Sequence, residues 1–391
     1  MDFAESPEHA LLRSAVRDIG AGFGHDYFVE QARSGRKTDE LWQAIAEHGF
    51  LGVHLPEEYG GGGAGISELA IVTEELAAQG CPLLLILVSA AICGELLARF
   101  GTDEQRATWL PGLASGEKMV FAITEPDAGS NSHNLSTTAT RDGDVYRLRG
   151  TKTFISGVDE APAMVVVTRT STEPDTGRGR LSLFVVDTDA PGLTRAHIPV
   201  EISAPEKQFQ LFFDDVEVPA DRLLGDEGEG LRQVFFGLNP ERIMSASICT
   251  GIGRYALERA SEYANERAVW DVPIGRHQGI AHPLAIAKIE LELARLMTAK
   301  AAWMHDRSRD WHSDDRVAAG EAANMAKYAA AEAGLRCLDA AIQTHGGNGM
   351  ASEYGLADLW GTVRLLRIAP VSREMVLNFV AQQSLGLPKS Y

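Results

Sequence analysis

The chain is predicted to be an α+β protein in which two helical parts flank a central β domain. Three observations predict this: helix-capping residues fill the first third of the chain, short β-branched and aromatic runs follow, and helical periodicity then continues to the end. A length of 391 residues fits two or three domains. We expect an all-helical domain over 1–118, a β domain over 119–227 and a helical bundle over 228–391.

The helices of the N-terminal domain are predicted from their first turns. Ser, Thr and Asp side chains accept hydrogen bonds from the free N–H groups of a helix start, and Pro at the first helical position loses no bond. The positions that carry this chemistry are Ser6-Pro7, Thr38-Asp39, Ser67 and the capping box from Thr102 to Gln105.

The middle domain is predicted from runs whose residues favour strands. The runs are MVFAIT, VYRLRG, TKTFIS, AMVVVTRT, LSLFVV and FQLFFDDVEV, with Gly, Pro, Asp and Ser turns between them. No long helical pattern separates these runs, which disfavours a parallel βαβ sheet. We therefore expect an antiparallel barrel or sandwich.

The C-terminal domain is predicted to be a four-helix bundle. Asn239 as N-cap and Pro240 at the first helical position mark the start of its first helix. The third helix is rich in Ala, which suits close helix packing. Helical periodicity places the four helices at 239–268, 280–306, 315–345 and 369–384.

Composition and motifs exclude several classes of function. A net charge of −18 repels nucleic acid and anionic membranes, and no apolar run is long enough to span a membrane. The N-terminus lacks the features of a signal peptide and the four Cys residues are scattered, so we expect a soluble cytoplasmic protein without disulfides. No G-x-G-x-x-G follows a strand pattern, and H-E-x-x-H and G-x-S-x-G are missing, which disfavours a Rossmann site, a metal centre and a serine nucleophile.

The run from Phe121 to Asn131, FAITEPDAGSN, is the first candidate ligand-binding feature. A strand pattern leads into a turn of small residues, where Gly129 allows backbone geometry that other residues resist. Such a turn leaves backbone N–H groups free to face an anionic ligand. Turns of this composition are also common without any ligand, so both interpretations stay open on this run alone.

This run resembles the T-E-P-x-A-G-S-D signature of the acyl-CoA dehydrogenase family, with Asn131 in place of the final Asp. The resemblance covers almost the whole chain, and the helix–β–helix order agrees with the family's fold. It implies FAD as the cofactor. The FAD contacts implied here are Phe121, Ile123 and Thr124 along the flavin ring, and Gly129 and Ser130 near the pyrophosphate and the CoA ester.

A second run, TFIS at 153–156, resembles the family's W-I-T-N segment. The resemblance implies that Phe154 shields one flavin face and that Ser156 hydrogen-bonds near the flavin N5. On strand periodicity alone, Phe154 is instead an inward-facing aromatic. The family's spacing between the two runs favours the flavin role.

Two C-terminal segments are similar to family segments that contact the FAD of a neighbouring subunit. QTHGGNG at 343–349 resembles Q-x-x-G-G-x-G, and Arg267 to Gln278 resembles R-x-x-F-G…Q, with Trp and Asp replacing Phe and Gly. The alternatives are a helix C-cap for the glycines and a helix-end cation for Arg267. The implied contacts are Arg267 with the pyrophosphate, Trp270, Gln278, Gln343, Gly346 and Gly347, while Ser372 and Glu374 align with further FAD-contacting positions. Such sharing implies at least a dimer, and by family habit a dimer of dimers, that is, a homotetramer.

The implied reaction removes a proton from the carbon α to a thioester and a hydride from the β carbon. It therefore needs a carboxylate that is shielded from water. Much of the family carries this Glu in an I-Y-E-G-T-S-E run near the C-terminus. This chain reads IAPVSRE over 368–374, which places Pro370 at the expected position of the base. Proline cannot abstract a proton.

Glu241 is the candidate replacement for the missing base. Isovaleryl and long-chain members of the family place a Glu at this position, on the first long C-terminal helix in an x-E-R context. Arg242 and Asn239 match the family's D-x-x-R pair at the CoA end, with Asn in place of Asp. A structural interpretation stays open, because an acid in the first turn after Asn-Pro is good helix-start chemistry. The helix dipole lowers the pKa of such a Glu, whereas burial raises it.

The resemblance thus implies FAD-dependent conversion of an acyl-CoA to a trans-2-enoyl-CoA in fatty acid β-oxidation, with a branched or long acyl chain favoured. An electron-transferring flavoprotein would take up the electrons. Two alternatives remain open. One is a noncatalytic flavoprotein or acyl-CoA-binding homologue, which Pro370 favours. The other is a flavin oxidase or monooxygenase on the same fold with a substrate other than a CoA ester.

Overall fold

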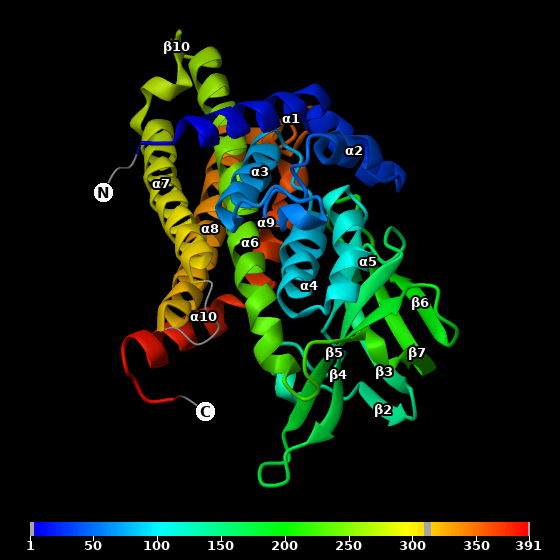
Figure 1. The fold of residues 1–391 in the computed structure, drawn as a ribbon. Helices are drawn as coiled ribbons and strands as arrows, with labels where there is room; N and C mark the ends of the chain where they lie inside the picture. The colour runs from blue at the N-terminus through cyan, green and yellow to red at the C-terminus, as the bar shows by residue number, and fades with distance from the viewer. Residues whose placement is uncertain (1–3, 309–313, 390–391) are drawn as a thin grey trace.

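The computed structural model describes residues 4–308 and 314–389, so the outermost limits of the expected domains, residues 1 and 391, lie outside the described residues. The N-terminal helices pack against the C-terminal helices along α3 and α6, and the sheet lies at one end of α6 (Figure 1). The N-terminal elements are α1 Pro7–Ser34, α2 Asp39–Glu47, α3 Ile66–Ala78, a π-helical segment Ile86–Gly94, α4 Glu95–Phe100 and α5 Asp103–Ala114.

Local capping chemistry sets two of the N-terminal helix starts. The Ser6 hydroxyl accepts a hydrogen bond at the start of α1, and the capping box at Thr102–Gln105 is present at α5. The predicted start at Ser67 is wrong, because α3 begins one residue earlier. Its first N–H groups, those of Ile66 and Ser67, donate to the carboxylate of Asp306 at 2.7 and 3.0 Å. A carboxylate 240 residues away therefore caps this helix.

The strands form one eight-stranded sheet in the order β6-β7-β3-β2-β4-β5-β8, with β1 paired to β4. Most neighbours are antiparallel, as predicted, but β1 and β2 each pair with β4 in parallel. The predicted antiparallel β domain is therefore confirmed, apart from these two parallel pairings. The strands are β1 Met119–Ala122, β2 Thr138–Asp142, β3 Val145–Ser156, β4 Ala163–Thr172, β5 Gly179–Asp187, β6 Leu193–Ile198, β7 Gln208–Pro219 and β8 Leu223–Leu224.

The C-terminal part is helical, but two of its predicted boundaries are wrong. The elements are α6 Gly230–Glu266, the hairpin β9 Ala268–Val269 and β10 Val272–Pro273, α7 Gln278–Arg307, α8 Asp314–His345, α9 Trp360–Ile368 and α10 Arg373–Phe379. Asn239 and Pro240 lie inside α6, because apolar residues before them, such as Val234 and Phe236, are buried and continue the helix backwards. The predicted helix at 369–384 begins four residues later, because Ser372 caps α10, and it continues as a π-helical segment over Val380–Ser384.

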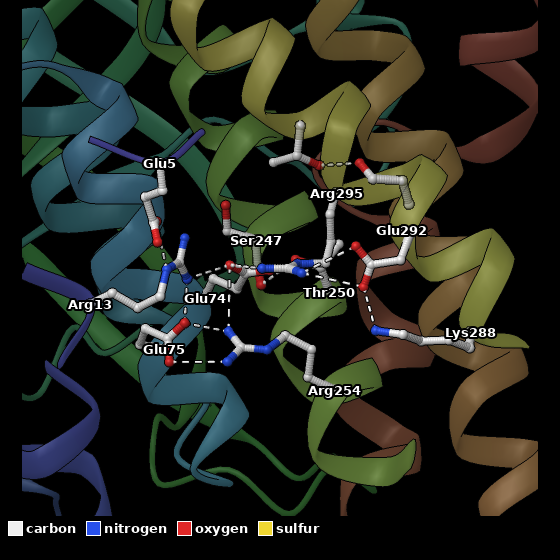
Figure 2. A network of polar contacts seen from close by, with 12 residues as sticks. Glu5, Arg13, Glu74, Glu75, Ser247, Thr250, Arg254, Lys288, Glu292 and Arg295 are labelled. Atoms are coloured by element: carbon white, nitrogen blue, oxygen red, sulfur yellow. Dashed lines mark hydrogen bonds and ion pairs between the residues drawn. The ribbon is translucent and has the colours of Figure 1, made fainter. Parts of the chain in front are cut away.

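A buried charge network joins four helices of the two helical parts (Figure 2). Glu74 and Glu75 of α3 lie between Arg13 of α1, Arg254 of α6 and Arg295 of α7. The Glu74 carboxylate is 2.8 Å from Arg13 Nη1 and 2.7 Å from Arg295 Nε. Burial opposes the charge on Glu74, but Arg295 and the other two arginines outweigh it and lower the pKa to about 2.

Replacing one carboxylate of this network is expected to destabilise the fold. Glu75 is fully buried, so Glu75→Gln removes one of the two buried carboxylates that face Arg13 and Arg254 and leaves Glu74 to balance the arginines of the network. We expect a loss of about 3 kcal/mol in the free energy of unfolding, measured in urea. Glu292→Gln is the matched control at the exposed rim, with an expected loss of less than about 1 kcal/mol. Equal losses for the two variants would contradict the importance assigned to the buried pair.

Candidate functional site

One wall of the site rests on a buried ion pair within the first signature run. Glu125 is 3% exposed, and its carboxylate accepts hydrogen bonds from Ser136 N at 2.6 Å and Thr137 N at 3.0 Å. The fully buried Lys152 of β3 donates to Glu125 Oε1 at 2.8 Å and to Ile123 O at 2.9 Å. Burial opposes the charge on Glu125, but the Lys152 ammonium outweighs it and lowers the pKa to about 2. The pair is therefore ionised and fixes the loop to the strand.

The same contacts bring the two signature runs together. Thr153 N donates to Thr124 O at 2.9 Å, directly beside the Glu125–Lys152 pair. Residues 121–125 and 152–156 thus lie side by side, although the sequence separates them by some thirty residues. The predicted FAD contacts of these segments, Phe121, Ile123, Thr124, Phe154 and Ser156, therefore share one region of the structure.

Phe154 departs from the conformation of an ordinary strand residue. Its φ is 55°, and the register between β3 and β7 shifts between Lys152 and Ile155. Such a bulge re-aims the side chain, and Phe154 is 59% exposed. The interpretation as an inward-facing strand aromatic is therefore wrong. An exposed aromatic ring held at a strained backbone position suits contact with a planar ligand.

The loop after β1 leaves open space beside its glycine. Glu125 and Ala128 exchange backbone hydrogen bonds of 3.1 and 3.2 Å, which close a tight turn before Gly129 and Ser130. The φ of Gly129 is not positive, and an added Cβ there would meet no described atom within 4 Å. The expectation that special backbone geometry requires glycine here is therefore wrong. The open space and the exposed Ser130 suit a bound ligand, whereas nothing in the structure explains Asn131 in place of Asp.

Glu241 lies inside α6, and its environment is that of a candidate base. Its side chain is partly exposed, yet Oε2 is buried without a hydrogen-bond partner in the described part of the chain. Burial raises the pKa of Glu241 to about 8, although Arg242 and Lys327 oppose the rise. The helix begins eleven residues earlier, at Gly230, so the helix-start explanation of this acid is wrong. A desolvated carboxyl with a pKa near neutrality is what proton abstraction requires.

Arg242 is a buried cation next to this carboxyl. It is 7% exposed, its Nη1 donates to Asn239 Oδ1 at 2.7 Å, and its guanidinium lies 5.9 Å from the centre of the Phe235 ring. Burial lowers the pKa of Arg242 to about 10, with Glu241 opposing the shift. Because Asn239 is neutral, it satisfies the hydrogen bond without cancelling the charge. The charge can therefore act on an anionic or carbonyl group of a ligand.

The turn that would carry the usual base offers no shielded carboxylate. Pro370 lies between α9 and α10, and the Ser372 hydroxyl accepts from Met375 N at 3.3 Å as the cap of α10. The Glu374 side chain is 72% exposed and lies 3.8 Å from Arg373. Neither the exposed Glu374 nor the proline can serve as a base shielded from water.

The predicted cross-subunit residues gather at the other end of the bundle. Arg267, Trp270, Gln278, Gln343, Gly346 and Gly347 are all exposed. The start of α6 packs on the backbone of β5, because a Cβ at Gly230 would come within 2.6 Å of Leu181 O. The 37 residues of α6 then separate this start from Arg267 by about 55 Å. Figure 1 shows β10 at the end of the molecule remote from the sheet. One copy of the chain therefore does not bring these six residues together with the candidate FAD contacts at the sheet.

The hairpin between α6 and α7 projects an aromatic side chain outward. Trp270 and Asp271 have φ values of 52° and 63°, as in a two-residue primed hairpin turn. Trp270 is 82% exposed. At the same end of the bundle, His345 of the second motif stacks on Tyr263 near the end of α6, with ring centres 4.2 Å apart. The Asp that replaces Gly here thus adopts the left-handed conformation that glycine would otherwise provide.

Sequence reasoning missed two buried lysines, Lys152 and Lys327. For Lys152 a signal existed, because it has the same strand parity as the buried Tyr146 and Leu148 of β3. For Lys327 only its place in an Ala-rich helix was visible. Its side chain is 1% exposed, and Nζ donates to Val371 O and, at 3.2 Å, to Arg367 O.

Among residues 4–308 and 314–389, no helix is long and apolar enough to cross a membrane, and no cluster of His, Cys, Asp and Glu could hold a metal ion. The cysteines are free and buried. The residues present fit FAD in two places: an exposed ring with an open loop at the sheet, and exposed glycines, Arg267 and Trp270 at the end of the bundle.

Comparison with known proteins identifies the family. The chain matches models of the N-terminal, middle and C-terminal domains of acyl-CoA dehydrogenase over 6–117, 120–216 and 228–385. It is 57% identical to the acyl-CoA dehydrogenase FadE12 of Mycobacterium tuberculosis over 390 residues, which cover 100% of this chain and 99% of that protein. It is 33% identical to the (2S)-methylsuccinyl-CoA dehydrogenase of Cereibacter sphaeroides, over 95% of this chain and 69% of the relative.

Solved structures agree with this assignment. Butyryl-CoA dehydrogenase from Megasphaera elsdenii superposes with a TM-score of 0.90 at 27% identity, over 98% of this chain and 100% of that one. The glutaryl-CoA dehydrogenase complex with glutaryl-CoA gives 0.89 at 31% identity, over 100% and 98%. PigA with FAD and proline gives 0.91 at 26% identity, over 99% and 100%. The matched domains, the relative at 57% identity and the site geometry show that the chain belongs to the acyl-CoA dehydrogenase family of FAD-dependent oxidoreductases.

Proposed function

We propose that the protein converts an acyl-CoA thioester to its trans-2-enoyl-CoA with Glu241 as the base. The observation that carries this proposal is the carboxyl of Glu241, whose Oε2 is buried without a partner in the described chain. FAD, when bound, supplies the acceptor for the hydride that leaves the β carbon. The ionised Glu241 takes the α proton, and the surrounding burial keeps water from competing.

The neighbouring residues support binding and orientation. Arg242 offers a buried positive charge one residue from the base, and Asn239 holds its guanidinium in place. The exposed ring of Phe154 covers one face of the flavin in this proposal, with Ser156 at the ring edge. In this proposal Gly129 and Ser130 offer backbone N–H groups to the pyrophosphate and to the thioester end of the substrate.

We infer that the complete site needs two copies of the chain, as a dimer or a dimer of dimers. About 55 Å of helix separates the sheet end of α6 from Arg267, and Trp270 projects from the hairpin beyond it. A twofold arrangement would place the hairpin of one copy against the sheet end of another. Arg267, Trp270, Gln278, Gln343, Gly346 and Gly347 of one copy, with Ser372 and Glu374, would then complete the cofactor site.

An electron-transferring flavoprotein is the proposed acceptor, and a branched or long acyl chain in cytoplasmic β-oxidation is the proposed context. The acceptor is supported by a solved structure from work on the electron transferring flavoprotein of Acidaminococcus fermentans, with a TM-score of 0.91 and 27% identity. The substrate class is supported by the position of Glu241 on α6 and by Pro370 in the turn.

A second candidate is oxidation of a substrate that is not a CoA ester. It is favoured by the fold similarity to the prolyl acyl carrier protein oxidase AnaB, with a TM-score of 0.90 at 27% identity. Anaerobic mixing of the FAD-loaded protein with acyl-CoAs and with proline separates the two functions. Flavin bleaching by acyl-CoAs alone supports the dehydrogenase, whereas bleaching by proline or a prolyl carrier protein supports the oxidase. No bleaching by either class favours a noncatalytic homologue.

Glu241→Gln is expected to abolish bleaching by an acyl-CoA while the FAD content stays unchanged, because the amide cannot accept the α proton. Above neutral pH, the urea concentration at the unfolding midpoint is expected to be higher for this variant than for the wild type. The raised pKa means that the wild-type fold loses stability as the pH increases from the ordinary range of Glu towards about 8, and Gln removes this loss. Retained turnover would show that the base lies elsewhere.

The pH profile of kcat/KM is expected to carry the titration of the base. Glu241 acts when deprotonated, so activity should rise with pH and level off above about 8, the pKa to which burial raises this carboxyl in the free protein. Stopped-flow reduction over a pH series measures it. An acidic limb in the ordinary range of a solvated Glu would contradict the buried environment described for the base.

Arg267→Ala is expected to lower FAD retention, measured by the flavin content after dialysis, because the pyrophosphate loses a charge-assisted partner. Arg276→Ala is the matched control, since Arg276 is also exposed between the hairpin and α7.

Co-expression of Arg267→Ala with Glu241→Gln tests the sharing between copies, because hybrid dimers regain one site with both wild-type residues. Activity no higher than in the single variants would contradict a shared site.

A further inference from the structure

A buried lysine of α8 faces the turn of α6 that carries Glu241. Two close approaches fix the alignment of these helices: Cβ atoms added at Gly320 and Gly334 would lie 3.5 Å from Asn239 Nδ2 and 2.8 Å from Cys249 O. Lys327 is midway between the two glycines, so it lies level with the residues just after Glu241. It is 1% exposed, which means that its side chain ends inside the protein.

The Lys327 ammonium is tied to the turn that holds Pro370. Nζ donates to Arg367 O at 3.2 Å and to Val371 O, the carbonyls on either side of the proline. Arg367 lies in the last turn of α9, where helix carbonyls lack partners within the helix. These two bonds leave one of the three N–H groups of the ammonium for another neighbour.

The charge of Lys327 has no ion-pair partner within 4 Å among the described residues. The charged and titratable groups that act on it are Cys249, Glu241 and Arg242 from α6 and Glu374 from α10. Glu241 in turn acts on Cys93 of the π-helical segment packed against α6. Of the two acids, the Glu374 side chain is exposed, whereas the Oε2 of Glu241 is buried. Burial lowers the pKa of Lys327 to about 8, and Cys249 and Glu241 oppose the fall, because opposite charges enclosed together favour each other's ionised form.

We propose that Lys327 is a positioning residue for proton abstraction, whose ammonium fastens the 367–371 turn to α8 and keeps the neighbouring Glu241 carboxylate charged within the pocket. This rests on the proposed role of Glu241. The turn contributes only carbonyl groups to Lys327, because Pro370 carries no acid. In this proposal the acid that balances the charge of Lys327 is therefore Glu241 of α6.

Lys327→Gln and Lys327→Met both test the charge of the lysine. Gln keeps N–H donors for the turn but carries no charge, whereas Met loses both. The readout is the infrared band of the protonated Glu241 carboxyl in the FAD-loaded protein, identified by its absence in Glu241→Gln and followed against pH. Both Lys327 variants are expected to shift its midpoint upwards by about one pH unit, a tenfold loss of carboxylate at a fixed lower pH. The acidic limb of flavin reduction should move with it.

Lys118→Met is the control, since Lys118 is also buried but its charge is paired with Glu160 and Asp39. It should leave the infrared midpoint unchanged. An unchanged midpoint in Lys327→Gln, with normal FAD content, overturns the proposal and leaves Lys327 a purely structural residue. If Glu241→Gln retains turnover, the proposed function fails instead. The infrared midpoints still report whether Lys327 acts on Glu241, so the two failures are distinguishable.

Discussion

The ion pair between Glu125 and Lys152 holds one wall of the candidate site together. Both side chains are buried, and desolvation of two charges is costly unless every remaining polar atom is bonded. Here the Glu125 carboxylate also accepts from the Ser136 hydroxyl at 2.7 Å and from two backbone N–H groups, while Lys152 reaches Ile123 O. Because Glu125 and Lys152 have hydrogen-bond partners for nearly all their polar atoms, the loop that carries Glu125 and the strand β3 form one rigid unit. The exposed ring of Phe154 and the open space at Gly129 depend on that unit, because Phe154 lies at the irregularity of β3 beside Lys152 and Gly129 lies in the loop after Glu125.

Two glutamates of the chain show how partners decide the role of a buried acid. Glu125 has a lysine and three N–H or O–H donors, and its pKa falls to about 2. The Oε2 of Glu241 has no partner in the described structure, and burial raises the pKa to about 8. The first is a permanent charge that holds backbone together, and the second can exchange a proton near neutral pH. Lys327, held by carbonyls at the 367–371 turn, supplies a counter-charge that limits the rise without cancelling it.

The length of α6 sets the architecture of the proposed assembly. Its start packs on β5 and its end leads into the hairpin that carries Trp270, so the predicted cofactor contacts are divided between two distant regions of one copy. The network of Glu74 and Glu75 with three arginines ties α1, α3 and α7 to this helix and keeps it in place (Figure 2). A rigid connection of this kind is what two copies would need to present complementary ends to each other.

The sequence by itself determined the features that are encoded between near neighbours in the chain. Periodicity predicted the helix–β–helix order, the capping box at Thr102–Gln105 was readable as written, and the x-E-R context singled out Glu241. Tertiary structure alone decided the features that depend on distant partners. Asp306 caps α3, buried apolar residues extend α6 past Asn239 and Pro240, and a bulge turns Phe154 outward. It also decided that Glu241 is desolvated inside a helix and lies near Lys327. Burial and electrostatic environment are set by residues far apart in the sequence, which local patterns do not record.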